Sequence, residues 1–293
     1  MSKAREFLES MLEYHLSQLA IIKQSDVMIV YGPMTNDLPG AVRTQIERLI
    51  NHRDCTEMLT IVLDTGGGLV DSVERTVGVI RQYYGQVDFI IPDKAKSAGT
   101  VFALAGDNIY MDFYSQLGPI DPQFYIDEKW IPGVGYLEKF KELNEKSANG
   151  TLTPLEYMLI DKIDLADLHQ FEQAREHSVE LLEQWLSAFK FKNWRKTEST
   201  GKKVSQQMKQ KRAKDIALKL NDTKRWHAHS RGISMKTLQE ELNLKIEDMG
   251  ESKYSGLHAE VKKTHSFIVD FMETTESFAC LRTAPYEQSE NVE

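Results

Sequence analysis

Two stretches decide the fold: residues 58–70, MLTIVLDTGGGLV, and residues 87–105, VDFIIPDKAKSAGTVFALA. Each begins with a run of β-branched and aliphatic residues, which is typical of a buried strand. Each continues through small residues into apolar positions at helical spacing. A strand followed by a helix, twice in succession, indicates parallel pairing and an α/β fold. The sequence therefore predicts that both strands end at the same edge of one sheet.

Small residues mark the two strand ends. Gly66, Gly67 and Gly68 follow the first strand, and Ser97 follows the second at the head of an apolar helix. Backbone amides at such a helix start stabilise negative charge, as in a phosphate site or an oxyanion hole. A Walker loop needs Lys-Ser/Thr after the last glycine, and a dinucleotide fingerprint needs another spacing, so neither fits. A plain tight turn and an ordinary serine N-cap remain the structural alternatives.

Composition limits the classes of function. The 293 residues carry a formal net charge of −8, and no run of 18 apolar residues predicts a membrane span. The first 24 residues carry acids throughout and lack the layout of a signal peptide, so we expect a cytoplasmic protein. An acidic chain is not built to grip nucleic acid, and we do not expect nucleic acid or a membrane as a partner.

One segment departs from this balance. Residues 190–225 hold thirteen Lys and Arg against three acids, a local charge of +10 that leaves −18 for the rest of the chain. A solvated helical face explains such a run. The alternative is a patch that binds an acidic partner. Nucleic acid is the less favoured partner of this kind, because the segment contains few aromatic residues.

The continuation ALAGDNIYMDFYSQLGPIDPQ, residues 103–123, gives a specific resemblance. A Gly-Gly turn after a strand, with Ser-Ala-Gly 29 residues beyond the last glycine, resembles Clp-type serine peptidases and signal peptide peptidase A. The continuation is more similar still to the serine dehydrogenase proteinase family. The resemblance implies a Clp/crotonase-like βαβ spiral core with a helical C-terminal extension. It also implies hydrolysis of peptides or unfolded proteins through an acyl-enzyme, without metal or cofactor.

The resemblance assigns roles residue by residue. Ser97 becomes the nucleophile, and the backbone amides of Gly68 and Ala98 become the oxyanion hole. Clp-type peptidases carry a histidine just before a Gln-Pro in the next segment. Here that segment is GPIDPQ, residues 118–123, and it contains no histidine. A Clp-like order of triad residues therefore does not apply directly.

Two replacements for the base stay open. The serine dehydrogenase proteinases imply the order Ser, Asp, His, with Asp121 as the orienting acid and His229, or secondarily His227, as the base. A turn-forming aspartate and a surface histidine are the structural alternatives. The pair His227-x-His229 lacks a third ligand at a recognisable spacing, so no metal is expected. The other replacement is a Ser97–Lys146 dyad, as in signal peptide peptidase A, with Lys146 just before Leu152-Thr153-Pro154.

The expected organisation has three parts. Residues 1–150 form the α/β core with an N-terminal helix, residues 151–282 a helical extension contributing to the active site and oligomerisation, and residues 283–293 a frayed tail. By analogy with the superfamily we expect a homo-oligomer. A crotonase-type acyl-CoA enzyme and a non-catalytic Clp-fold interaction protein are the alternative functions, and dependence of activity on Ser97 separates them from a peptidase.

Overall fold

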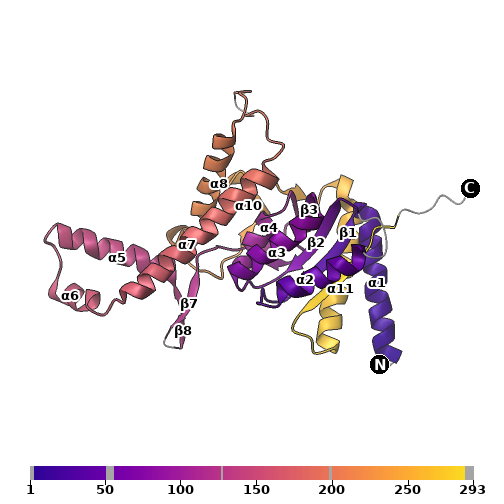
Figure 1. The fold of residues 1–293 in the computed structure, drawn as a ribbon, viewed down its shortest axis with the longest axis horizontal. Coiled ribbons are helices and arrows are strands. Elements are labelled where there is room, and N and C mark those ends of the chain that lie inside the picture. The colour runs from indigo at the N-terminus through magenta and orange to yellow at the C-terminus, as the bar shows by residue number, and fades with distance from the viewer. Residues whose placement is uncertain (1–2, 51–55, 127, 198–199, 288–293) are drawn as a thin grey trace, which may run out of the picture.

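A six-stranded sheet forms the centre of the protein in the computed structural model, which describes residues 3–50, 56–126, 128–197 and 200–287 (Figure 1). Its order is β10-β5-β3-β2-β1-β11, and every pair is parallel except β1 with β11. The strands are β1 (Asp26–Tyr31), β2 (Met58–Asp64), β3 (Gln86–Ile90), β5 (Asn108–Met111), β10 (Glu247–Asp248) and β11 (Cys280–Ala284). The predicted α/β class, with parallel pairing of the strands, is confirmed.

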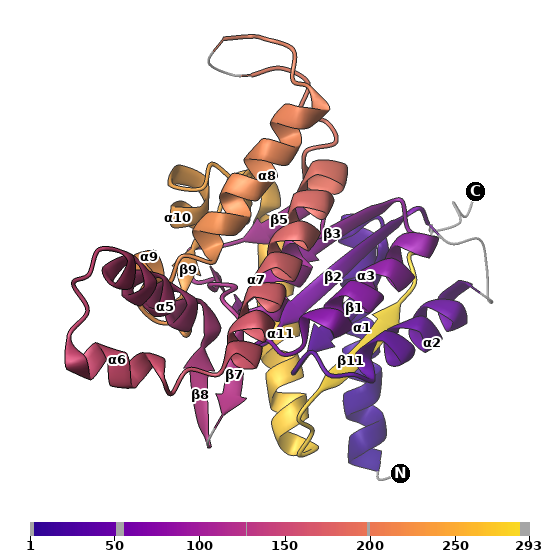
Figure 2. The same cartoon turned by 60° about the vertical axis from the view of Figure 1, so that its left-hand side comes forward.

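Helices cover both faces of the sheet, as the continuous apolar strands require. In β1, Met28 and Val30 join the core with the helices on one face, while Val27 and Ile29 join the core on the other. Figure 2 shows the first face under α2 and α3, with α1 and α11 behind the sheet, and Figure 1 labels α4 beside α3. These helices are α1 (Lys3–Lys23), α2 (Leu38–Ile50), α3 (Val70–Tyr83), α4 (Ala98–Leu104) and α11 (Ser255–Thr274).

The second half of the chain is mainly helical, as predicted. Helices α7 and α8 pack along each other, and α5 with α6 projects away from the central sheet in both views (Figures 1 and 2). Apart from three short strands of a second sheet, the remaining elements are β7 (Gln123–Ile126), β8 (Lys129–Pro132), α5 (Gly133–Ala148), α6 (Pro154–Ile160), α7 (Leu165–Trp185), the π-helix η1 (Leu186–Lys190), α8 (Gln206–Leu220), α9 (Thr223–Trp226), α10 (Met235–Glu240) and the 3₁₀ turn η2 (Ser252–Tyr254). A domain boundary near residue 150 stays a prediction.

Two details differ from the sequence analysis. The stretch after Thr153-Pro154 contains few helix-breaking residues and favours one long helix, but α6 ends at Ile160 and α7 begins after Asp164, whose side chain caps it by accepting from the Ala166 amide. The predicted start of the frayed tail, residue 283, is too early in the chain, because Thr283 pairs with Met28 in the central sheet. Residues 288–293 of that tail lie outside the described residues.

Candidate active site

A small second sheet aligns the three segments that carry the predicted triad. Its strands are β4 (Lys94–Ala95), β6 (Gln116–Leu117) and β9 (Ile233–Ser234), in the order β4-β6-β9. Ala95 pairs with Leu117, and Leu117 pairs with Ile233. Ser97 follows β4 by two residues, Asp121 follows β6 by four, and His229 precedes β9 by four. Segments separated by more than 100 residues are thus held in one register.

Ser97 lies in a strained turn between β4 and α4. Its φ is +52° and its ψ is −122°, a conformation that favours glycine and that non-glycine residues adopt rarely. Holding a serine there costs about 1–3 kcal/mol. The Ser97 side chain makes no capping hydrogen bond at the start of α4, so the ordinary N-cap explanation does not apply. Backbone strain at a polar residue on a helix start is typical of a nucleophile held forward from the chain.

The glycine turn packs directly against Ser97. Gly67 has a φ of +113°, and a Cβ added there would lie 2.8 Å from the Ser97 Cβ. Gly68 has a φ of +146°, and a Cβ there would lie 2.5 Å from the carbonyl oxygen of Met34. Two backbone hydrogen bonds fix this approach, from Met34 N to Gly67 O and from Leu69 N to Met34 O, each at 2.9 Å. Only glycine fits either position.

Two amides near Ser97 have no protein acceptor among the described residues. The Gly67 amide donates to Thr65 Oγ1 at 3.0 Å, but the amides of Gly68 and Ala98 donate to no described group. Ala98 is the first residue of α4, where the amides at a helix start point outward toward a ligand. The pair is therefore free to stabilise an oxyanion.

Asp121 and His229 form the contact that the sequence analysis predicts. His229 Nδ1 lies 2.9 Å from Asp121 Oδ1, although 108 residues separate them. The Asp121 side chain is 4% exposed, and its other oxygen accepts from Gln123 Nε2 at 2.7 Å. The His229 side chain is 27% exposed. Because the buried Asp121 carboxylate accepts the proton on Nδ1 of His229, Nε2 is the ring nitrogen available for proton transfer.

Two further contacts join these segments, and they involve residues that the sequence analysis did not single out. Lys96 Nζ donates to the carbonyl oxygen of Ser230 at 2.8 Å, which ties the neighbour of Ser97 to the neighbour of His229. The Gly118 amide donates to Thr100 Oγ1 at 2.9 Å, and that hydroxyl lies 2.7 Å from the Ala95 carbonyl oxygen. Lysine and threonine are common residues, so nothing in the sequence alone marks them.

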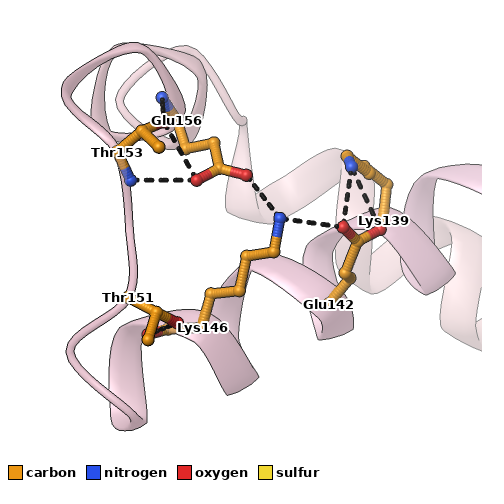
Figure 3. A network of polar contacts seen from close by, with 6 residues as sticks. All are labelled: Lys139, Glu142, Lys146, Thr151, Thr153 and Glu156. Atoms are coloured by element: carbon orange, nitrogen blue, oxygen red, sulfur yellow. Dashed lines mark hydrogen bonds and ion pairs between the residues drawn. The ribbon is translucent and has the colours of Figure 1, made fainter.

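Lys146 is arranged unlike a catalytic base. It lies in the last turn of α5, in the part of the chain that projects from the sheet (Figure 1). Its Nζ binds Glu156 Oε1 at 2.6 Å and Glu142 Oε1 at 3.2 Å, as Figure 3 shows. These carboxylates, Glu156 first, raise the pKa of Lys146, whereas a base requires a lowered one. The structure therefore argues against the Ser97–Lys146 dyad.

His227 also takes no part in the contacts. It is exposed and ends α9 in a left-handed conformation with a φ of +64°. Its backbone amide donates to the Thr223 carbonyl oxygen, which closes the helix. Within the described residues, no group of three or more His, Cys, Asp and Glu side chains is arranged to hold a metal ion.

Comparison with protein families agrees with this geometry. Residues 41–204, more than half of the chain, match the model of the ClpP-like SDH-type serine proteinases. The chain belongs to this family. The match includes Gly68, Ser97 and Asp121 and ends before His229. The resemblance to serine dehydrogenase proteinases is therefore confirmed, and with it the predicted class of a Clp-type α/β core with a helical C-terminal part.

Two curated relatives match short stretches of the chain. Two uncharacterized proteins of Methanocaldococcus jannaschii are 32% identical over 94 residues and 34% identical over 79 residues. The first alignment covers 32% of this chain and 31% of the relative, the second 27% and 28%. The chain thus spans about three tenths of the length of these curated relatives.

Two peptidases are among the solved structures that the comparison matched. A membrane-bound stomatin-specific protease, the 1510-N protein, is 23% identical, with 42% of this chain and 63% of that chain covered at a TM-score of 0.32. ClpP1 from Listeria monocytogenes is 11% identical, with 84% and 98% covered at a TM-score of 0.42. In the described part of this proteinase-family chain, no helix has the length and apolar character needed to span a membrane.

Proposed function

We propose that the chain hydrolyses peptide bonds through an acyl-enzyme formed on Ser97. The observation that carries the proposal is the shared register of β4, β6 and β9, which gathers the segments of Ser97, Asp121 and His229. The Asp121–His229 hydrogen bond and the strained backbone of Ser97 support it further. Membership of a serine proteinase family supports the reaction class.

The proposed first step forms the acyl-enzyme. His229 Nε2 takes the proton of the Ser97 hydroxyl as Oγ attacks the carbonyl carbon of the scissile bond. The oxygen of the tetrahedral intermediate accepts hydrogen bonds from the amides of Gly68 and Ala98, which have no other described acceptor. The intermediate then collapses, and His229 gives its proton to the departing amine. Asp121 accepts from Nδ1 and stabilises the positive charge on the imidazole ring.

The second step releases the acyl group. Water attacks the ester carbonyl while His229 Nε2 removes its proton, and the new tetrahedral intermediate expels Ser97 Oγ, which regains the proton. The products are a carboxylic acid and the free hydroxyl. No step of this cycle uses a metal or a cofactor, so the residues of the chain account for every proton.

Covalent labelling with a fluorophosphonate, read by intact mass, tests the proposal. We expect one adduct on the wild-type chain, none on Ser97→Ala, and strongly slowed labelling of His229→Ala. Lys146→Ala is the matched control and should label at the wild-type rate. An unlabelled wild type, or a labelled Ser97→Ala, would overturn the proposal. An acyl-CoA enzyme of the crotonase type and a non-catalytic binding protein both predict no adduct that depends on Ser97.

Wider properties of the proposed peptidase stay predictions. Peptides or unfolded proteins are the expected substrates, and self-association and a cytoplasmic location are expected as before.

Basic residues of the segment 190–225 form part of α8, whose buried face packs on α7. Four basic residues of the segment pair with acids of this chain: Lys192 with Asp107, Lys214 with Glu183, Lys224 with Glu138 and Arg225 with Glu241. An acidic partner for the remaining cations of this segment is still a prediction.

A further inference from the structure

A cavity of about 840 Å³ opens beside the glycine turn, at the carboxyl ends of β1 and β2. Tyr31, Asp64 and Gly66 line it from the sheet, and Asp93 and Lys94 from the segment after β3. Helix α11 and the residues after it form the opposite wall. None of the proposed catalytic side chains lines this cavity.

The cavity is nevertheless continuous with the backbone that positions Ser97. The Thr65 amide donates to the Lys94 carbonyl oxygen at 3.0 Å, and the Lys96 amide donates to the Thr65 carbonyl oxygen at 3.1 Å. Gly66 of the cavity wall directly precedes Gly67, which packs against Ser97. A ligand in the cavity therefore lies beside the backbone turn that packs against Ser97.

Asp64 is a mostly buried acid in the wall of the cavity. Its side chain is only 13% exposed, and no described residue donates a hydrogen bond to its carboxylate. The two nearest basic groups, Lys94 and His265, lie closer to other partners. Lys94 Nζ lies 4.0 Å from Asp64 but 2.8 Å from Asp93, and His265 Nδ1 lies 3.8 Å from Asp64 but bonds Tyr31 Oη at 2.9 Å. A mostly buried carboxylate without a protein donor gains a charge-assisted hydrogen bond when a cationic ligand supplies the donor.

The other lining residues favour a ligand with a positive charge on an apolar stem. Asp93, Glu273 and Glu276 add three carboxylates to that of Asp64, against the single ammonium of Lys94. Burial lowers the pKa of His265, which keeps its imidazole neutral. Apolar side chains line the α11 side of the cavity, and they can cover a methylene chain while its charged end reaches Asp64. They are Val269, Met272 and Phe278.

We propose that this cavity binds a cationic group of the peptide substrate, with Asp64 as its counter-ion. The shared chemistry is an ammonium or guanidinium group, which a lysine or arginine side chain or a free amino terminus supplies. The inference rests on the proposed peptidase function for its biological meaning. The cavity and its charges exist independently of Ser97, so binding can be measured without turnover.

Binding of agmatine, a guanidinium on a short methylene chain, tests the site directly. Calorimetry on Ser97→Ala at pH 7.5 should show agmatine binding, and Asp64→Asn in the same background should weaken it about 10- to 100-fold. Asp270→Asn removes the same charge from an exposed position of α11 outside the cavity and should leave the affinity unchanged. Equal affinity in the Asp64 and Asp270 variants would overturn the proposal.

Cleavage of matched peptides then tests its role. Peptides with lysine or arginine at one position should be cleaved with a kcat/KM about 10- to 100-fold above that of glutamine or norleucine peptides, and Asp64→Asn should abolish the preference. Acetylated and free amino termini distinguish a side chain from an α-ammonium as the source of charge. If Ser97 labels but neither cation is preferred, this inference fails while the peptidase proposal stands. If wild type does not label, the peptidase proposal fails and the agmatine result still decides the site.

Discussion

Gly67 and Ser97 pack so closely that a methyl group on Gly67 would lie 2.8 Å from the Ser97 Cβ and 2.9 Å from the Lys96 carbonyl oxygen. Gly67→Ala must therefore displace the turn that carries Ser97, and its φ of +113° adds strain. We expect fluorophosphonate labelling to slow about 100-fold or more, since a displacement of 1 Å is sufficient for such a loss. Gly78→Ala, in open space within α3, is the control and should label normally. Equal rates in the two variants would contradict the packing argument.

The Asp121–His229 contact predicts a loss of catalysis without a loss of fold. Asp121→Asn keeps the shape of the side chain but no longer holds the Nδ1 proton with a carboxylate. We expect kcat/KM for peptide cleavage to fall by about 10³- to 10⁴-fold. Asp215→Asn, at an exposed position of α8, is the matched control. Near-normal cleavage by Asp121→Asn would show that Asp121 does not orient the base.

The strained backbone of Ser97 predicts that a glycine at this position makes the protein more stable than an alanine does, although both variants are inactive. Glycine relieves a φ of +52°, whereas alanine retains the strain, so Ser97→Gly should unfold at higher urea concentration than Ser97→Ala. The expected difference is about 1 kcal/mol, because the greater freedom of glycine in the unfolded chain offsets part of the relief. Both variants should fail to label. Should Ser97→Ala prove the more stable variant, the strain at this position would not be real.

Because Asp64 is mostly buried, replacing its carboxylate with a neutral group should increase the stability of the protein in a pH-dependent way. Desolvation raises the pKa of Asp64 from 3.8 to about 6, although Lys94 opposes this rise. The folded protein then binds a proton more readily than the unfolded chain, so the ionised carboxylate costs stability that grows as the pH rises from about 4 to 6 and stays constant above. Asp93, His265, Glu273, Glu276 and Tyr31 are the other titratable groups that line the same cavity.

Asp64→Asn should therefore raise the free energy of unfolding by roughly 1–3 kcal/mol at pH 7.5 and by much less at pH 4. Urea unfolding at both pH values, with Asp270→Asn as the control, measures the difference. A gain that is the same at both pH values would mean that Asp64 titrates normally. The same variant is expected to lose cation binding. A gain in stability together with a loss of binding would show that Asp64 costs stability but recognises the ligand.

The sequence was sufficient for the parts of the site that depend on local patterns. Residues 58–70 and 87–105 predict the strand ends, the glycine turn and the start of α4, because each feature is encoded by adjacent residues. The Asp121–His229 contact came instead from a family resemblance, since no periodicity relates residues 108 positions apart. The contact depends on the pairing of Leu117 with Ile233, and the two paired strands are too short to predict from composition.

Other features depend on contacts that the sequence does not reveal. Lys146 precedes a Leu-Thr-Pro helix start and so met the pattern of a catalytic lysine. Its carboxylate partners are Glu142, one turn earlier in the helix, and Glu156 of the next helix, and these contacts decide against that role. The cavity beside Gly66 joins β1 and β2 to α11, about 200 residues later, and could not be expected from either segment alone.

The late position of α11 and β11 in the chain has a consequence for how the protein is made. During synthesis, residues 26–234 emerge before α11 and β11, which complete the cover over Val27 and Ile29 and pair with the edge of β1. Until residues 255–284 follow, α1 alone covers that apolar face and the edge of β1 stays unpaired, which is the kind of surface that holdase chaperones recognise. The residues proposed for catalysis are thus all synthesised before the cavity beside them has its second wall. The nascent protein gains its proposed cation site only when its last helix docks.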